Sequence, residues 1–322
     1  MGTVMSMLLC AKKKHVQMWG HDREQLMEMA EDRENKKFLP GYKLPKNLEF
    51  EPDDEKIMKG TELILSAVPC QFIRSVWTRL KKYTPENIPI VSVAKGIENG
   101  TLLRPTQIIA DVLELSDNDR LAVLSGPTIA DELARKLPAT ACAAGTNEKL
   151  IKQIQTTFST TWFRVYTNTD ITGVELAGAM KNVIAIAAGM IDGTRAGDNC
   201  KAALVTRGLA EIMRLGTACG ARQETFIGLT GLGDLVTTCI SPTGRNRSFG
   251  EKIGKGHTVE LVQKSMDSVV EGIATCESVV ALAQKKDVEM PITQAVYEIL
   301  FRNKPVQQAI FELMNRKLKA EL

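Results

Sequence analysis

The order of strand and helix patterns along the chain limits its fold more than any other feature of the sequence. Up to Asn168, short β-rich runs alternate with helical patterns; beyond it, helical patterns follow one another and strand signals almost vanish. Such alternation predicts a parallel sheet covered by helices on both faces. We therefore expect an α/β domain with a doubly wound parallel sheet in residues 1–169, followed by an all-helical domain in residues 170–322.

The expected strands all lie in the first domain and cover residues 16–19, 48–50, 62–68, 88–93, 121–124, 139–143 and 163–166. Helical patterns cover residues 72–82, 106–113, 148–157, 173–191, 200–217, 221–227, 248–253, 258–264, 274–286, 292–302 and 305–313. A doubly wound sheet binds ligands beyond the carboxyl ends of its strands. The loops after these strands therefore predict a nucleotide cleft, which a second domain would close.

Composition argues against several classes of protein. The formal net charge of +3 over 322 residues is too small for the strong field of a nucleic-acid-binding surface, and the lysine run 12–14 is interpreted as a solvated helix end. Seven cysteines without a CxxC pair and three distant histidines argue against a disulfide framework and a zinc site. With no signal peptide and no uncharged apolar run of about 18 residues, we expect a cytoplasmic protein with no membrane span.

Lys181 and Asn182 interrupt a stretch, residues 176–191, that is otherwise apolar and rich in small residues. A helix that is apolar all round is buried, and a buried ammonium is costly unless it is paired. Reduction of a ketone by hydride needs a proton donor for the developing alkoxide, and a lysine can serve, since no histidine stands in a suitable position. The alternative is a lysine that reaches the surface from a core helix.

A glycine-rich run, residues 228–233, precedes Asp234. The run follows a helix rather than a strand, so we interpret it as a tight backbone crossing and not as a dinucleotide loop. Asp234 would then suit a buried Lys181 as its partner. A helix-capping role for this aspartate is equally compatible with the spacing.

Two further segments could bind anionic or polar groups. The loop 241–247 carries Arg245 just before a helix, and guanidinium groups and helix-start amides both suit phosphate. A solvated surface loop is the alternative. The turn 125–128 lies at the end of a strand, where its N–H groups would contact a ligand. The alternative is a turn in which Thr128 caps the next helix, a role that can coexist with ligand binding.

Together these segments resemble the NAD(P)-dependent glycerol-3-phosphate dehydrogenase family over nearly the whole chain. The resemblance rests on the order and spacing of many modest motifs: VSVAKGIE (91–98), LSGPT (124–128), FRVYTN (163–168), GVELAGAMKNVIAIAAGM (173–190), TRGLAEI (206–212), LTGLGDLVTTC (229–239), RNRSFG (245–250), VVEG (269–272) and MPIT (290–293).

The resemblance implies a Rossmann-like first domain and a role for each matching residue. Lys181 matches the general acid and base at the C2 oxygen, and Asp234 the carboxylate beside it. Lys95 matches a lysine that reaches substrate and cofactor, and Arg245, which grips the phosphate with Asn246, also lies near the cofactor. The remaining matches are Gly126 and Thr128 for substrate; Ala130, Val269 and Glu271 for cofactor; His21 for the adenosine ribose; and Gly244, where the family often has serine.

The start of the chain departs from the family pattern. Family members open with a strand and a GxGxxG turn, whereas here Gly2 aligns with the last glycine and the first strand is missing. Removing a central strand leaves its neighbours with unpaired groups that cost roughly 1–3 kcal/mol each. We expect that the natural protein starts upstream of Met1 or that the chain as written binds cofactor poorly; a relic that really lacks the strand is the alternative.

The sequence as a whole therefore predicts an oxidoreductase that uses NAD(P)H to reduce dihydroxyacetone phosphate to sn-glycerol 3-phosphate for glycerophospholipid synthesis. A dehydrogenase of another small phosphorylated ketone and a non-catalytic nucleotide-binding relic are the alternatives. The choice between NAD and NADP stays open, because His21 and Arg23 suit a 2′-phosphate whereas Asp22 opposes it. The sequence is silent on oligomeric state and leaves a homodimer open.

Overall fold

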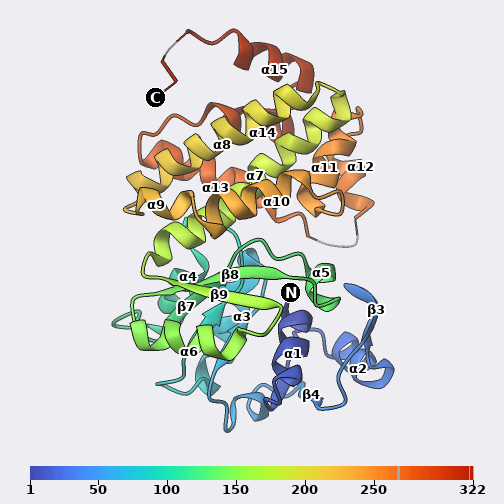
Figure 1. Cartoon of the computed structure of the whole chain (residues 1–322), viewed down its shortest axis with the longest axis vertical. Helices are drawn as coiled ribbons and strands as arrows, with labels where there is room; N and C mark the ends of the chain where they lie inside the picture. The colour runs from blue at the N-terminus through green and yellow to red at the C-terminus, as the bar shows by residue number, and fades with distance from the viewer. Residues whose placement is uncertain (267–268, 319, 322) are drawn as a thin grey trace. The chain divides into compact units, whose positions relative to one another are not determined.

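The protein packs into two compact units, each with its own core (Figure 1). The computed structural model describes residues 1–266, 269–318 and 320–321. Unit 1 comprises Met1–Lys95 and Leu103–Glu175, and unit 2 comprises Gly96–Leu102 and Leu176–Leu322. The functional division into residues 1–169 and 170–322 stays a prediction.

Unit 1 is built on a five-stranded sheet in the order β5-β6-β7-β8-β9. Its strands are β5 (Ile64–Ser66), β6 (Ile90–Ser92), β7 (Leu121–Ser125), β8 (Ala139–Gly145) and β9 (Phe163–Asn168). The predicted Rossmann-like α/β fold is confirmed, with one antiparallel pairing, β7 with β8, that strand–helix alternation does not reveal. The connection between these strands, residues 126–138, holds only the short helix α5 (Ala130–Ala134), whereas a parallel crossover usually carries a full helix.

A second pair of parallel strands, β1 (Val16–Met18) and β4 (Leu48–Phe50), forms a separate sheet in unit 1. In a doubly wound sheet the first strand would lie between β1 and β5. Among the described residues no strand occupies that position. A small antiparallel pair, β2 (Glu34–Asn35) and β3 (Leu39–Lys43), was not predicted. Its strands are too short and too exposed to show period-two alternation.

Helices cover both faces of the five-stranded sheet because its strand residues alternate between two cores. Val91 and Ala122 pack with residues of α1 (Gly2–Ala11) and α6 (Glu148–Phe158). Their neighbours Ile90 and Leu121 pack with α3 (Ile73–Leu80) and α4 (Pro105–Leu113) instead. The remaining helix, α2 (Arg23–Asp32), follows β1.

Unit 2 is helical and is organised around α7 (Ile171–Thr194), whose first five residues belong to unit 1. Around it lie α8 (Asp198–Ala218), α9 (Gln223–Phe226), a π-helical turn (Leu229–Gly233), α10 (Asp234–Ile240), α11 (Arg245–Gly254), α12 (Val259–Lys264), α13 (Glu271–Lys285), α14 (Pro291–Arg302) and α15 (Val306–Met314). By length and composition α7 could cross a membrane, but its apolar stretch is entirely buried inside the protein, as in a core helix.

Helices α7 and α11 touch backbone to backbone through four glycines. A Cβ atom on Gly250 would lie 2.0 Å from the carbonyl oxygen of Ile186, and one on Gly189 would lie 1.9 Å from that of Arg247. One turn further along, Gly193 and Gly254 meet the facing helix in the same way, at 2.2 and 2.4 Å. Only glycine allows such an approach, so these residues fix how the two helices cross.

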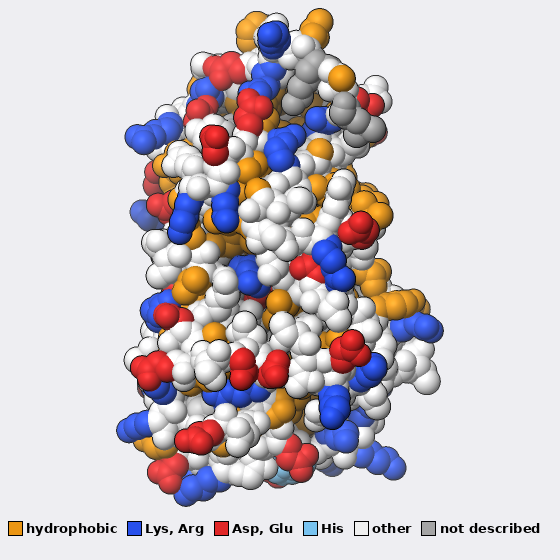
Figure 2. Space-filling model, turned by 90° about the vertical axis from the view of Figure 1, so that its left-hand side faces the viewer, with side chains coloured by type: hydrophobic (Ala, Val, Ile, Leu, Met, Phe, Trp, Pro, Cys, Tyr) orange, Lys and Arg blue, Asp and Glu red, His pale blue; other side chains and the backbone are white. Residues whose placement is uncertain are grey.

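Charged side chains of both signs are interspersed on the face shown in Figure 2. This mixture agrees with the small net charge of the chain. On this face, electrostatic attraction therefore favours neither a polyanionic nor a polycationic partner.

We predict that Gly250→Ala lowers the free energy of unfolding by about 1–3 kcal/mol, the usual cost of overpacking. The new methyl group would meet a backbone carbonyl that cannot turn away. Gly208→Ala is the matched control, because its methyl group would meet the movable side chain of Ile184 instead. Chemical denaturation measures both variants, and equal stability of the two would contradict the proposed rigidity of the α7–α11 crossing.

Candidate active site

Lys181 is buried in α7 and is paired. The residue is 6% exposed, and its Nζ donates to Asp234 Oδ1 at 2.6 Å and to Thr238 Oγ1 at 2.5 Å. Asp234 is itself 1% exposed. The ammonium therefore does not extend to the surface. A carboxylate balances its charge inside the core, as a buried charge requires.

Thr238 belongs to this cluster, although sequence reasoning gave it no role. Its hydroxyl accepts from Lys181 and donates to the carbonyl oxygen of Asp234 at 2.7 Å. The available signal was the spacing: residues four apart on a helix share one face, so Asp234 and Thr238 point the same way from α10. The cluster holds the lysine ammonium between two oxygens of one short helix.

The glycine-rich run before α10 is a backbone crossing, as predicted. A Cβ atom on Gly231 would lie 1.9 Å from the carbonyl oxygen of Phe226, so the π-helical turn passes directly over α9. The helix-capping alternative for Asp234 is wrong: Gly233 is the N-cap of α10, and Asp234 is the first helical residue. Its side chain is therefore committed to Lys181.

The predicted phosphate-binding residues lie at the start of α11. Gly244 is the N-cap, and the exposed Arg245 is the first helical residue; it makes no ion pair with the part of the chain that the structure describes. The first helical bond runs from Ser248 N–H to Gly244, so the preceding N–H groups have no partner within the helix. An unpaired guanidinium beside free helix-start amides suits an anion.

Asn246 is buried and is fixed by the neighbouring helix α13. Its Oδ1 accepts from the N–H of Gly272 at 3.0 Å. Glu271, predicted to lie beside the cofactor, is the first residue of α13, whereas Val269 is exposed before the helix. The structure thus brings Asn246 next to Glu271, and it places the buried carbonyl of Asn182 2.9 Å from a Cβ position on Gly272.

In unit 1 the structure brings Lys95 to the turn after β7. The Lys95 Nζ donates to the carbonyl oxygen of Gly126 at 3.0 Å, and the Thr128 hydroxyl donates to the same oxygen at 3.2 Å. Gly126 has φ +149°, and its Cβ would lie 2.9 Å from Ala141 Cα, so only glycine suits this turn. The capping alternative for Thr128 is wrong, since the N-cap of α5 is Ile129 and Ala130 is its first residue.

The other predicted cofactor residues of unit 1 lie at the ends of α1 and β1. Gly2 is the first residue of α1, whose first helical bond joins Met5 N–H to Met1. His21 is exposed after β1 and has no hydrogen-bond partner among the described residues. Asp22 caps α2 by accepting from Gln25 N–H at 3.1 Å, so its carboxylate already has a structural task.

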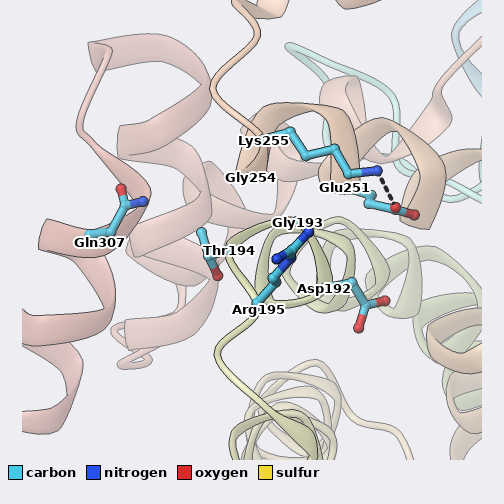
Figure 3. A pocket seen from close by; sticks show the side chains of 8 residues that line it. All are labelled: Asp192, Gly193, Thr194, Arg195, Glu251, Gly254, Lys255 and Gln307. Carbon is cyan, nitrogen blue, oxygen red and sulfur yellow. Dashed lines mark hydrogen bonds and ion pairs between the residues drawn. The ribbon is translucent and has the colours of Figure 1, made fainter.

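A cavity of about 640 Å³ in unit 2 contains none of these residues. It lies where α7 and α11 end, facing α15, and Figure 3 shows the Lys255–Glu251 ion pair on one side and Gln307 on the other. Its carboxylate Asp192 is already paired with Lys201 and Arg247. The chemistry predicted from the sequence therefore lies elsewhere in the fold.

Comparison with known proteins gives a consistent result over the full length. The family models described as "NAD-dependent glycerol-3-phosphate dehydrogenase" N-terminus and C-terminus match residues 1–151 and 170–311. A glycerol-3-phosphate dehydrogenase [NAD(P)+] of Geobacter sp. (strain M21) is 46% identical over 99% of this chain and 96% of its own length. One of Chlorobium phaeobacteroides (strain BS1) is 44% identical, covering 100% of this chain and 96% of that protein. The crystal structure of glycerol-3-phosphate dehydrogenase from Coxiella burnetii has a TM-score of 0.93 at 37% identity, with 98% and 96% of the two chains covered.

The pairing of Lys181 with Asp234 can be tested through protein stability alone, without an activity assay. Asp234→Leu would leave the Lys181 ammonium buried without its carboxylate and should lower the free energy of unfolding by about 3–5 kcal/mol. Adding Lys181→Met should recover most of that loss, because apolar replacement of a whole buried pair is often neutral. Chemical denaturation of both variants measures these free energies, and a double variant no more stable than Asp234→Leu would contradict the pairing.

Proposed function

The chain belongs to the NAD-dependent glycerol-3-phosphate dehydrogenase family, and we propose that unit 2 grips the substrate phosphate and transfers the proton while unit 1 binds the cofactor. The protein is an NAD(P)-dependent oxidoreductase that interconverts dihydroxyacetone phosphate and sn-glycerol 3-phosphate. The observation that carries the division of roles is the buried Lys181–Asp234 pair in an otherwise apolar helix.

Lys181 is the proposed proton donor to the C2 oxygen of dihydroxyacetone phosphate. As negative charge develops on that oxygen, the ammonium transfers a proton to it, and in the reverse direction the neutral amine takes the proton back. Asp234 and Thr238 hold Nζ by hydrogen bonds at 2.6 and 2.5 Å, so the donor is oriented before substrate arrives. This orientation supports a role in catalysis, since proton transfer needs a fixed donor.

Arg245 and Asn246 are the proposed phosphate grip, with the backbone of Gly244 beside them. The exposed guanidinium can form two charge-assisted bonds to phosphate, and the first turn of α11 adds unpaired N–H groups. The Gly244 N–H already donates to the carbonyl oxygen of Ser241 at 3.2 Å, and glycine has no hydroxyl to add where the family often has serine.

The proposed cofactor residues of unit 1 suit a dinucleotide. Gly2 opens α1 with N–H groups free of intrahelical partners, which suits a pyrophosphate. The exposed His21, which follows β1, is the proposed contact of the adenosine ribose. We also assign to the cofactor Lys95 and Ala130 of unit 1, together with Val269 and Glu271, which belong to unit 2. Lys95, Gly126 and Thr128 are proposed substrate residues. When bound, NAD(P)H supplies the hydride.

We further propose a cytoplasmic location, a homodimeric assembly and a supply of glycerol 3-phosphate for glycerophospholipids. All seven cysteines are free thiols, which suits a reducing compartment. No nucleic acid or membrane span is part of this proposal.

Lys181→Ala should reduce kcat by about 10²–10⁴-fold, the usual effect of losing a general acid, with cofactor affinity little changed. Steady-state kinetics and direct cofactor titration measure the two quantities. A fall in kcat of less than about tenfold would remove Lys181 from the role of proton donor.

Arg245→Ala should raise the KM for dihydroxyacetone phosphate strongly and that for unphosphorylated dihydroxyacetone much less, because the lost contact is directed at phosphate. The comparison needs only steady-state rates with both substrates. Lys252→Ala, on the same helix but bonded to Ser265, is the matched control. Equal losses on both substrates would rule out a phosphate contact.

A further inference from the structure

We infer that Gly272 is a positioning residue for substrate phosphate: its N–H and its missing side chain together fix the Asn246 amide in the orientation that binds phosphate. The inference rests on the phosphate role proposed for Asn246. It adds a residue of α13 that touches no substrate and acts through Asn246 on α11.

The hydrogen bond from Gly272 decides which face of the Asn246 amide is left for a ligand. Because the Gly272 N–H can only donate, it selects the amide oxygen, Oδ1, at 3.0 Å. The amide nitrogen, Nδ2, is then the other branch of the amide, and no described residue accepts a hydrogen bond from it. A free N–H₂ group requires an acceptor, which a phosphate oxygen supplies and an ammonium group does not.

The lack of space around Gly272 for any side chain explains why the residue is glycine. A Cβ atom there would lie 2.7 Å from Asn246 Oδ1, 2.7 Å from Ile186 Cδ1 and 2.9 Å from the carbonyl oxygen of Asn182. Real Cβ contacts are essentially never shorter than 3.0 Å, so one neighbour must move. The Asn182 carbonyl belongs to the α7 backbone and is held in place. The ends of the Asn246 and Ile186 side chains would therefore have to move.

The backbone of Asn246 cannot follow a displaced side chain. Helix α11 is held against α7 at Gly250, where the Cβ position lies only 2.0 Å from the carbonyl oxygen of Ile186. A methyl group on residue 272 would therefore turn the Asn246 amide rather than shift the helix. The expected consequence is weaker phosphate binding with the Lys181 cluster, on α7 and α10, left in place.

A double-mutant cycle tests this directly. Wild type, Gly272→Ala, Asn246→Ala and the double variant are compared by kcat and by KM for dihydroxyacetone phosphate at saturating cofactor. We expect each single variant to raise KM by roughly tenfold or more, the usual effect of losing a hydrogen bond to a charged group, with kcat little changed. The double variant should show no further rise, because Gly272 acts only through Asn246.

The outcomes separate this inference from the proposed function. Two results would overturn the inference only. One is a KM in the double variant that rises by the product of the two single increases; the other is an unchanged KM in Gly272→Ala alongside a raised KM in Asn246→Ala. An unchanged KM in Asn246→Ala would overturn the phosphate role as well. Gly208→Ala, which adds a methyl group against the movable Ile184 side chain in the same unit, should leave KM unchanged.

A second variant keeps the test valid if Gly272→Ala folds poorly. Asn246→Asp has nearly the same shape and still accepts from Gly272 N–H, but it presents an oxygen where Nδ2 stood. We expect a greater rise in the KM for dihydroxyacetone phosphate than in Asn246→Ala, because a carboxylate repels the phosphate. A KM close to that of wild type would show that this face does not donate and would overturn the inference.

Discussion

The backbone contact between α7 and α11 is the constraint on which the geometry of unit 2 depends. Glycines on both helices bring the Ile186 carbonyl within 2.0 Å of a Cβ position on Gly250, so neither helix can slide past the other. The same two helices carry Lys181 and Asn246. The proposed proton donor and the proposed phosphate-binding amide are thus set apart by two rigid helices rather than by loops, and rigid elements hold such groups at a constant separation.

Burial of α7 then dictates how the charged groups pair. An ammonium in an apolar helix is tolerated only with a close partner, and α10 supplies both Asp234 and Thr238 from one face. The glycine-rich turn before α10 makes this possible, since only a glycine at position 231 lets the chain pass so close to α9 on its way to Asp234. If Lys181 is the proton donor that we propose, the contacts that make its ammonium tolerable inside the protein also orient the proton that it transfers.

The sequence predicted the features that follow from local pattern. The apolar stretch around Lys181 predicted a buried helix, and its lone ammonium predicted a carboxylate partner, found in Asp234. Features that depend on packing between distant segments were missed. The antiparallel β7–β8 pairing depends on how a short connection turns, and the contact of Gly272 with Asn246 joins residues 26 apart in sequence. Neither leaves a periodic signal, and spacing alone could not decide whether Asp234 capped a helix or paired with a lysine.

The most direct test of the account is an initial-rate assay of the purified protein with dihydroxyacetone phosphate and each reduced nicotinamide cofactor. The account predicts oxidation of NADH or NADPH that depends on dihydroxyacetone phosphate, with glycerol 3-phosphate formed in equal amount. Unphosphorylated dihydroxyacetone should react far more slowly, because it lacks the group that Arg245 and Asn246 would bind. Folded protein that binds cofactor yet shows no oxidation dependent on dihydroxyacetone phosphate, or that reduces both ketones equally well, would contradict the account.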